Sequence, residues 1–156
     1  MFPFAAAAIR RLNEAGLAVV VVTNQSGVAR GYFPESLVHE VHEAMKRKLA
    51  HGGARVDGIY YCPHSSVDGC DCRKPKTGML ERAGRELGLD VKQSFVVGDR
   101  YGDVQLAFNT GARGILVRSG YGEGEWNWHR ESWPKAPDYV AMDLQQAADW
   151  ILRQVR

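Results

Sequence analysis

The sequence predicts an α/β protein, a Rossmann-like three-layer α/β/α fold with a mostly parallel sheet. Two observations support this. Apolar runs rich in β-branched residues alternate with segments whose apolar residues recur every three or four positions, and glycine-containing polar turns separate them. Strands that alternate with helices form parallel sheets covered on both faces. The 156 residues are expected to form one domain, with an inserted loop at residues 62–74.

The first half of the chain opens with a predicted helix over residues 3–16. Residues 17–22 are a continuous apolar run, which is typical of a strand buried on both faces. A second helix is expected over 34–51, and a second strand over 56–61. The buried face of the second helix is expected to consist of Leu37, Val41, Met45 and Leu49.

The second half continues the alternation, because short apolar runs are again followed by glycine and then by helical periodicity. A loop is expected over 120–137. The last helix starts near Asp143, with Gln146 placed for a capping box. The other predicted elements are, in chain order, a helix over 79–87, a strand over 94–97, a short helix over 103–109 and a strand over 114–117.

Composition argues against several classes of protein. The apolar content of 45% and charged content of 24% are ordinary for a globular protein, and a net charge of +2 is too small to indicate nucleic-acid or membrane binding. No apolar run approaches the roughly 20 residues that span a bilayer. The N-terminus has no basic region ahead of its apolar residues, so a signal peptide is not expected and the predicted location is cytoplasmic.

All three cysteines lie close together in one stretch, with a histidine among them. Three thiolates and one imidazole are the ligands of a closed tetrahedral zinc site. The alternative is unrelated buried thiols beside a surface histidine. A disulfide is less favoured, because it would leave one cysteine over. The predicted zinc ligands are Cys62, His64, Cys70 and Cys72.

Three motifs follow predicted strands or the cysteine loop, where α/β proteins place their ligands. Residues 23–27, Thr-Asn-Gln-Ser-Gly, could hold a phosphate or be an ordinary turn. Residues 73–76, Arg-Lys-Pro-Lys, could meet an anion or be a solvated basic loop. Asp99 ends a predicted buried strand and suits Mg²⁺, or it caps the next helix.

Taken together in this order, the motifs resemble the haloacid-dehalogenase-like phosphohydrolases. Thr-Asn-Gln-Ser-Gly-Val-Ala-Arg-Gly at 23–31, Tyr-Tyr-Cys-Pro-His at 60–64 and Cys-Asp-Cys-Arg-Lys-Pro at 70–75 are similar to the D-glycero-D-manno-heptose 1,7-bisphosphate phosphatase branch. Related histidinol-phosphate phosphatases share much of this pattern. The resemblance runs to about Gly120, and the tryptophan-rich segment after it is not diagnostic.

The resemblance implies a role for each matching residue. Thr23 would bond a phosphoryl oxygen, Lys74 would offset its negative charge, and Asp99 would hold the catalytic Mg²⁺ with support from Asp103. Arg73 and the turn at 24–25, which is Asn24 and Gln25, would contact a small phosphorylated sugar. Thr23, Lys74 and Asp99 are expected to converge on one cleft at the carboxyl edge of the sheet. Zn²⁺ would be structural, because four protein ligands leave no open position.

One family feature has no counterpart in these residues. The family uses an aspartate nucleophile in an Asp-x-Asp-Gly motif on a first strand, whereas the first aspartate here is Asp57. The expectation is an N-terminally shortened phosphatase domain in which strands 17–22 and 94–97 flank the place of that strand. A monomer is expected for the full-length family, and exposed strand edges would favour association of the shortened chain.

Two hypotheses follow. In the first, the protein is a Mg²⁺-dependent sugar-phosphate phosphatase that serves lipopolysaccharide precursor synthesis, with histidinol phosphate as the alternative substrate. In the second, it is a non-catalytic, zinc-stabilised phosphate-binding module. The residues alone do not distinguish between the two.

Overall fold

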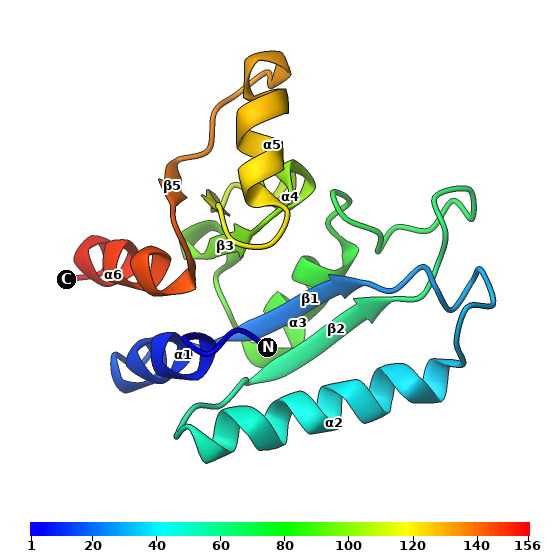
Figure 1. The fold of residues 1–156 in the computed structure, drawn as a ribbon, viewed down its shortest axis with the longest axis horizontal. Coiled ribbons are helices and arrows are strands. Elements are labelled where there is room, and N and C mark those ends of the chain that lie inside the picture. Colours follow the sequence, from blue (N-terminus) through cyan, green and yellow to red (C-terminus); the bar gives the residue numbers. More distant parts are fainter. The chain divides into compact units, whose positions relative to one another are not determined.

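The computed structural model describes residues 1–156, which divide into two compact units, 1–89 and 90–156 (Figure 1). Each unit has a parallel sheet with helices packed against it, so the predicted α/β class is confirmed. The expectation of a single domain stays a prediction. None of the helices combines the length and apolar character of a membrane-spanning segment.

The first unit is built on a two-stranded parallel sheet. Its register pairs Val20 with Gly58 and Asn24 with Cys62, so the two strands run side by side over their whole length. The elements of this unit are α1 (Ala5–Glu14), β1 (Val20–Asn24), α2 (Glu35–His51), β2 (Gly58–Cys62) and α3 (Gly78–Leu87).

Two adjacent tyrosines of β2 fix the helices of this unit on opposite faces of the sheet. Neighbouring residues of a strand point to opposite faces. The Tyr60 hydroxyl donates to Glu86 of α3 at 2.8 Å, whereas the Tyr61 hydroxyl donates to Glu35 of α2 at 2.6 Å. The sheet is therefore the middle of three layers, as predicted.

Helix α2 buries Leu49 as expected, but the rest of its buried face differs from the prediction. Val38, His42 and Leu49 are buried, whereas Leu37 is 40% and Val41 is 57% exposed. The helix carries two apolar stripes about one position apart, and periodicity alone does not say which one faces the sheet. The buried stripe includes a histidine because His42 packs edge-on against the Tyr61 ring, with ring centroids 5.7 Å apart.

Strand β1 is less buried than its apolar run predicts. All five of its residues are half-buried. The strand pairs only with β2, so it has a neighbouring strand on one side. An edge strand exposes more of its side chains than a central strand of the same composition.

The second unit has a three-stranded parallel sheet in the order β3-β4-β5. Trp150 of α6 meets the Phe95 ring on one face, whereas Val104 of α4 packs close to Gly114 on the other. The elements are β3 (Phe95–Gly98), α4 (Tyr101–Thr110), β4 (Arg113–Val117), α5 (Gly122–His129), β5 (Tyr139–Ala141), α6 (Leu144–Gln154) and the 3-10 turns Val91–Gln93 and Arg130–Ser132.

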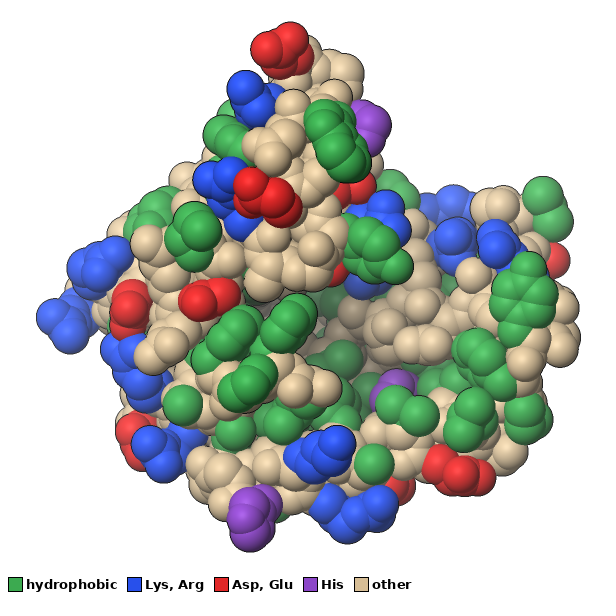
Figure 2. Space-filling view, in the orientation of Figure 1, with side chains coloured by type: hydrophobic (Ala, Val, Ile, Leu, Met, Phe, Trp, Pro, Cys, Tyr) green, Lys and Arg blue, Asp and Glu red, His purple; other side chains and the backbone are tan.

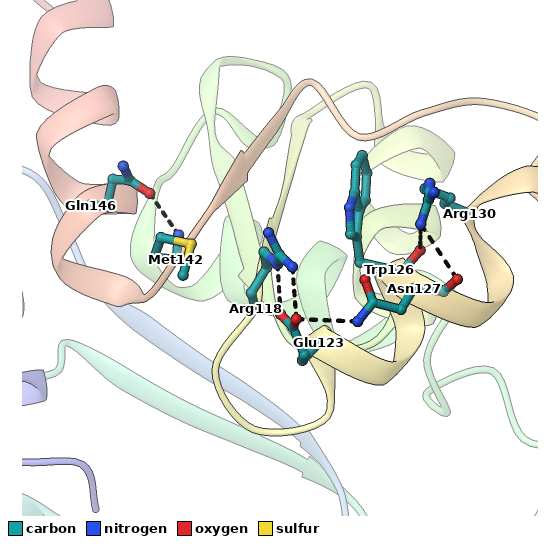
Figure 3. A network of polar contacts seen from close by, with 7 residues as sticks. All are labelled: Arg118, Glu123, Trp126, Asn127, Arg130, Met142 and Gln146. Atoms are coloured by element: carbon teal, nitrogen blue, oxygen red, sulfur yellow. Dashed lines mark hydrogen bonds and ion pairs between the residues drawn. The ribbon is translucent and has the colours of Figure 1, made fainter.

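The expectation of a loop over 120–137 is wrong, because this segment contains α5 and a 3-10 turn, and strand β5 follows it. Tertiary contacts order the segment. Trp133 stacks on Tyr101 with ring centroids 4.4 Å apart. Arg118 makes two bonds to Glu123, at 2.6 and 2.7 Å, which join the end of β4 to α5 (Figure 3). Such contacts are not visible in local sequence.

The start of α6 confirms the expected cap. Asp143 accepts a hydrogen bond from the backbone N–H of Gln146 at 2.9 Å. The Gln146 side chain in turn accepts from the backbone N–H of Met142 at 2.6 Å (Figure 3). The first bond satisfies an N–H group that the helix start leaves without an intrahelical partner. The second differs from the expected capping box, because Gln146 accepts from Met142 rather than from the N-cap residue Asp143.

We predict that the stability of the chain falls in mild acid partly through His42. Burial lowers the pKa of His42, and the nearby charges of His39 and Lys46 lower it further. The unfolded chain therefore binds this proton more readily, so the stabilisation is complete above about pH 6.5 and is lost as pH falls through the lower folded pKa. Urea unfolding at pH 8 and pH 5 should show a smaller difference for His42→Gln than for the unmodified chain.

The exposed His51 at the end of α2 provides the matched control. His51→Gln should keep the full difference between the two pH values. Equal pH dependence in His42→Gln and the unmodified chain would exclude His42 as a source of acid sensitivity.

Candidate functional site

The parallel pairing of β1 and β2 places the loops after both strands side by side. Asn24 and Cys62, the last residues of the two strands, are register partners. The pairing extends one step further, because the backbone N–H of Gln25 donates to the Cys62 carbonyl at 2.7 Å. The turn after β1 therefore adjoins the cysteine loop.

Asn24 ties the turn after β1 to the basic segment. Its side-chain oxygen accepts from the backbone N–H of Lys74 at 3.0 Å, and its side-chain nitrogen donates to the Lys74 carbonyl at 3.3 Å. The Lys74 ammonium donates to the carbonyl of Val22 in β1 at 3.1 Å. These contacts bring Lys74 to the end of a strand that lies far from it in sequence.

Thr23 and Arg73 are held by neighbours in the same region. The Thr23 hydroxyl accepts from the side-chain nitrogen of Gln25 at 3.0 Å, which orients it at the end of β1. The Arg73 guanidinium donates to the carbonyl of His64 at 3.4 Å, so this cation is attached to the cysteine loop. In Figure 2, Lys and Arg side chains gather over the loops that follow β1 and β2. This concentration of positive charge suits an anionic ligand.

The four predicted zinc ligands form one cluster. One ligand atom from each of Cys62, His64, Cys70 and Cys72 lies within 4.8 Å of all the others. The Cys62 sulfur lies 3.6 Å from that of Cys70 and 2.8 Å from that of Cys72, and His64 Nδ1 lies 3.2 Å from the Cys72 sulfur. A tetrahedral ion with bonds of about 2.3 Å holds its sulfurs about 3.8 Å apart. The cluster is compatible with a zinc site.

The two outer thiols of the cluster differ in acidity. Burial raises the pKa of Cys70, but hydrogen bonds from the backbone N–H groups of Arg73 and Cys72 and from the other thiols outweigh it, and the pKa falls to about 6. Burial raises the pKa of Cys72 to about 12, with a further contribution from the neighbouring thiols. The backbone N–H groups therefore favour a thiolate at Cys70, the form that binds a metal.

In the second unit, Asp99 directly follows β3. Its Oδ2 atom accepts from the backbone N–H of Tyr121 at 3.0 Å. Gly120 has a positive φ of 68°, and a Cβ there would lie 2.3 Å from Asp99 Oδ2. Glycine is therefore required for this close approach. Asp99 bonds to the segment after β4 rather than capping α4, which leaves Oδ1 available to a hard cation.

Asp103 is the carboxylate that closes the start of α4. It is buried, and its Oδ2 accepts from the backbone N–H of Arg100 at 3.2 Å. A Cβ on Gly98 would lie 2.1 Å from this oxygen, so the glycine makes room for the carboxylate at the end of β3. Asp99 and Asp103 belong to the second unit, and their convergence with Lys74 stays a prediction.

Sequence reasoning missed the residues of α5 that support the Asp99 loop. Glu125 accepts from the backbone N–H of Tyr101 at 3.1 Å and pairs with Arg100 at 3.4 Å. The Arg100 guanidinium lies over the Tyr121 ring, 3.8 Å from its centroid. The glycine at 120 and the two glutamates after it could have indicated a helix start here. The prediction of a loop over 120–137 left these residues out of the site.

We predict that Asn24→Ala destabilises the chain by about 1–3 kcal/mol, because a part-buried backbone N–H and carbonyl of Lys74 lose their partners. Urea unfolding measures this loss. The control is Asn127→Ala, which removes one exposed hydrogen bond to Glu123 and should change stability by no more than about 0.5 kcal/mol. Equal losses of unfolding free energy in the two variants would contradict a structural role for the hydrogen bonds between Asn24 and Lys74.

Known proteins are similar to this chain over most of its length. The HAD-hydrolase-like family model matches residues 71–147. The D-glycero-D-manno-heptose-1,7-bisphosphate 7-phosphatase of Thermosynechococcus vestitus is 39% identical over 97% of this chain and 82% of its own length. The corresponding β-heptose enzyme of Pseudomonas aeruginosa is 43% identical over 77% of this chain and 67% of its own length.

A solved structure agrees with these relatives. The D,D-heptose 1,7-bisphosphate phosphatase from B. bronchiseptica, complexed with magnesium and phosphate, matches with a TM-score of 0.88. It is 36% identical, and the match covers 98% of this chain and 84% of that one. The chain therefore belongs to the D-glycero-D-manno-heptose-1,7-bisphosphate 7-phosphatase family of the haloacid-dehalogenase-like hydrolases.

Proposed function

We propose that the protein is a cytoplasmic, Mg²⁺-dependent phosphatase that hydrolyses a phosphate monoester of D-glycero-D-manno-heptose 1,7-bisphosphate. The proposal rests on the two hydrogen bonds between the Asn24 side chain and the Lys74 backbone. They hold the Lys74 ammonium group at the end of β1, where Thr23 also lies. A relative named for this activity, 39% identical over 97% of the chain, supports the substrate class. Three free cysteines suit a reducing compartment.

Each residue of the first unit has a proposed role at the phosphate. The Thr23 hydroxyl donates to a phosphoryl oxygen while it accepts from Gln25. The Lys74 ammonium offsets the negative charge that remains on the phosphoryl group during transfer. Arg73, fixed on the cysteine loop, and Asn24 and Gln25 in the turn contact the sugar and its phosphate.

Asp99 is proposed to hold Mg²⁺. A carboxylate oxygen free of protein partners at the end of a strand fits a hard cation. When bound, Mg²⁺ neutralises charge on the phosphoryl group. Asp103 keeps the first turn of α4 closed behind Asp99 by accepting from the Arg100 N–H. The B. bronchiseptica relative contains magnesium and phosphate, which supports this choice of ion.

The cysteine cluster is proposed to bind one structural Zn²⁺. The donor set of three sulfurs and one imidazole, gathered within 4.8 Å, fits a tetrahedral ion and leaves no position for substrate. Its proposed task is to hold the loop that carries Arg73 and Lys74. The bond from Arg73 to the His64 carbonyl connects a ligand residue directly to a substrate-binding one.

We predict one zinc per chain by elemental analysis after expression in zinc-containing medium. Cys72→Ser should lose most of this zinc and lower the melting temperature, because a structural metal contributes to folding free energy. A chelator should do the same to the unmodified chain. Val67→Ser changes a residue of the same loop that is 88% exposed, and it should keep the metal. Full zinc content in Cys72→Ser would contradict the ligand assignment.

We predict that Lys74→Ala weakens binding of the heptose bisphosphate, with Mg²⁺ present, by about tenfold or more, because a charge-assisted contact to phosphate is lost. Isothermal titration calorimetry measures the affinity, with histidinol phosphate as the competing ligand. Lys48→Ala removes an exposed lysine of α2 and should leave affinity unchanged. Equal affinity of Lys74→Ala and the unmodified chain would remove Lys74 from the site, and tighter binding of histidinol phosphate would overturn the substrate assignment.

We predict little or no turnover when the 156-residue chain is assayed alone. The proposed chemistry uses an aspartate nucleophile, and no aspartate precedes Asp57 in these residues. Thr23 does not replace it, because its hydroxyl contacts Gln25 rather than a histidine base. Phosphate release from the heptose bisphosphate with Mg²⁺ measures this. Rapid release that Asp99→Asn abolishes would show that the chain contains another nucleophile.

A further inference from the structure

A groove of about 760 Å³ runs along the outer edge of β2, away from β1. Its residues all belong to the first unit. Lys74 contacts Val22 on the other strand of the sheet, so the groove is separate from the proposed phosphate site. Neither the zinc cluster nor the phosphate residues require a groove here, although the ligand residues His64 and Cys72 border one end of it.

The floor of the groove is a strand edge with unpaired backbone groups. Strand β2 hydrogen-bonds only to β1. The Gln25 N–H donates to the Cys62 carbonyl across the sheet, and alternate residues of a strand direct their backbone groups to opposite sides. Gly58, Tyr60 and Cys62 therefore face β1, whereas Ile59 and Tyr61 direct their N–H and C=O groups into the groove. An extended chain laid along β2 would find donors and acceptors at the spacing of a β-ladder.

Helix α3 forms one wall of the groove, and the opposite side is bordered by Glu35, the first residue of α2. Tyr61 bonds to Glu35, and Tyr60 bonds to Glu86 of α3. Because α3 and Glu35 border it, the edge is recessed. The recess favours a single extended chain over the β2 edge of a second copy, which would be recessed in the same way.

The ends of the groove differ in charge. Helix α3 runs opposite to β2, because its last residue, Leu87, lies beside Gly58 whereas its first, Gly78, lies beside Asp71. Arg82 and Arg85 of α3 line the groove toward the Gly58 end, where Glu86 pairs with Arg82 at 2.7 Å. The carboxylates of Glu35 and Asp71 line the end next to the zinc cluster. One end therefore carries net positive charge and the other negative charge.

We propose that this groove binds an extended peptide that adds a strand to β2 in the antiparallel direction. Its carboxyl-terminal carboxylate lies at Arg82 and Arg85, and its amino-terminal amine lies at Glu35 and Asp71. About five residues fill the length of β2, since a strand rises roughly 3.4 Å per residue. The ladder supplies affinity, and the charged ends fix the direction.

The test uses the peptide Lys-Val-Thr-Val-Asp with free termini and the zinc-loaded 156-residue chain labelled with ¹⁵N. Titration followed by NMR should shift the amide signals of Ile59 and Tyr61 most and give a dissociation constant. Two controls are the same peptide with the backbone amides of residues 2 and 4 N-methylated, and the same peptide with those of residues 3 and 5 N-methylated. At least one of them should bind at least fivefold more weakly, because one set of alternate amides faces β2.

Charge reversal tests the direction of binding. Arg85→Glu should weaken the peptide at least fivefold, and it should bind the reversed sequence Asp-Val-Thr-Val-Lys, with an amidated carboxyl end, better than the unmodified chain does. Arg47→Glu, an exposed position on α2 outside the groove, should bind like the unmodified chain. Circular dichroism confirms that both variants fold.

Three outcomes would overturn the proposal. One is no shift at Ile59 and Tyr61 at millimolar peptide, and another is equal binding of the parent and both N-methylated peptides. The third is a concentration-dependent dimer in sedimentation that shields these two amides and excludes the peptide, which would make a second copy of the chain the occupant. Loss of peptide binding would leave phosphate binding at Lys74 unaffected, so the two proposals fail independently.

Discussion

The in-register parallel pairing of β1 with β2 is the constraint on which the first unit depends. Because both strands end at the same edge, Asn24 stands next to Cys62, and the turn after β1 meets the loop after β2. Asn24 can then bond to both backbone groups of Lys74. A shift of one residue in this register would reverse the faces of all the β2 side chains. It would also separate Tyr60 and Tyr61 from the helices that they hold.

The cysteine cluster and the basic segment form one structural element. Arg73 donates to the His64 carbonyl, and the Lys76 ammonium donates to the Cys70 carbonyl. Both cations are thus bonded to the backbone of residues in the cysteine cluster. Cys70 and Cys72 pack against the apolar cluster around Tyr60 and Met79, and the proposed metal ion would fix the shape of the loop further. The positions of the cations follow from the shape of the loop.

In the second unit, the tryptophan-rich segment supports the end of β3. Helix α5 is held by the paired bonds of Arg118 to Glu123 (Figure 3) and by the aromatic contact of Trp126 with Trp133. Through Glu125 it satisfies the backbone N–H of Tyr101 at the start of α4. Asp99 and α4 therefore depend on a segment whose own sequence does not mark it as part of a site.

The sequence by itself determined the fold class, the four-ligand cluster and the family. Each of these depends on residues close together in sequence or on periodicity: the cysteines and histidine of 62–72, the alternation of strands and helices, and the motif at 23–31. Local chemistry is enough in such cases, because spacing along the chain already limits which side chains can meet. The cap of α6 at Asp143 was predictable for the same reason.

Only the tertiary structure decided which apolar stripe of α2 is buried, how the segment 120–137 folds, and which groups hold Lys74 and Asp99. The buried stripe of α2 was decided by the packing of His42 against Tyr61, a residue of strand β2. Helix α5 has little apolar periodicity of its own, and its segment is ordered because Trp133 stacks on Tyr101. Strand β5 forms because it pairs with β4. These contacts join residues that are remote in sequence, and burial energy, which local propensity does not contain, selects among the alternatives.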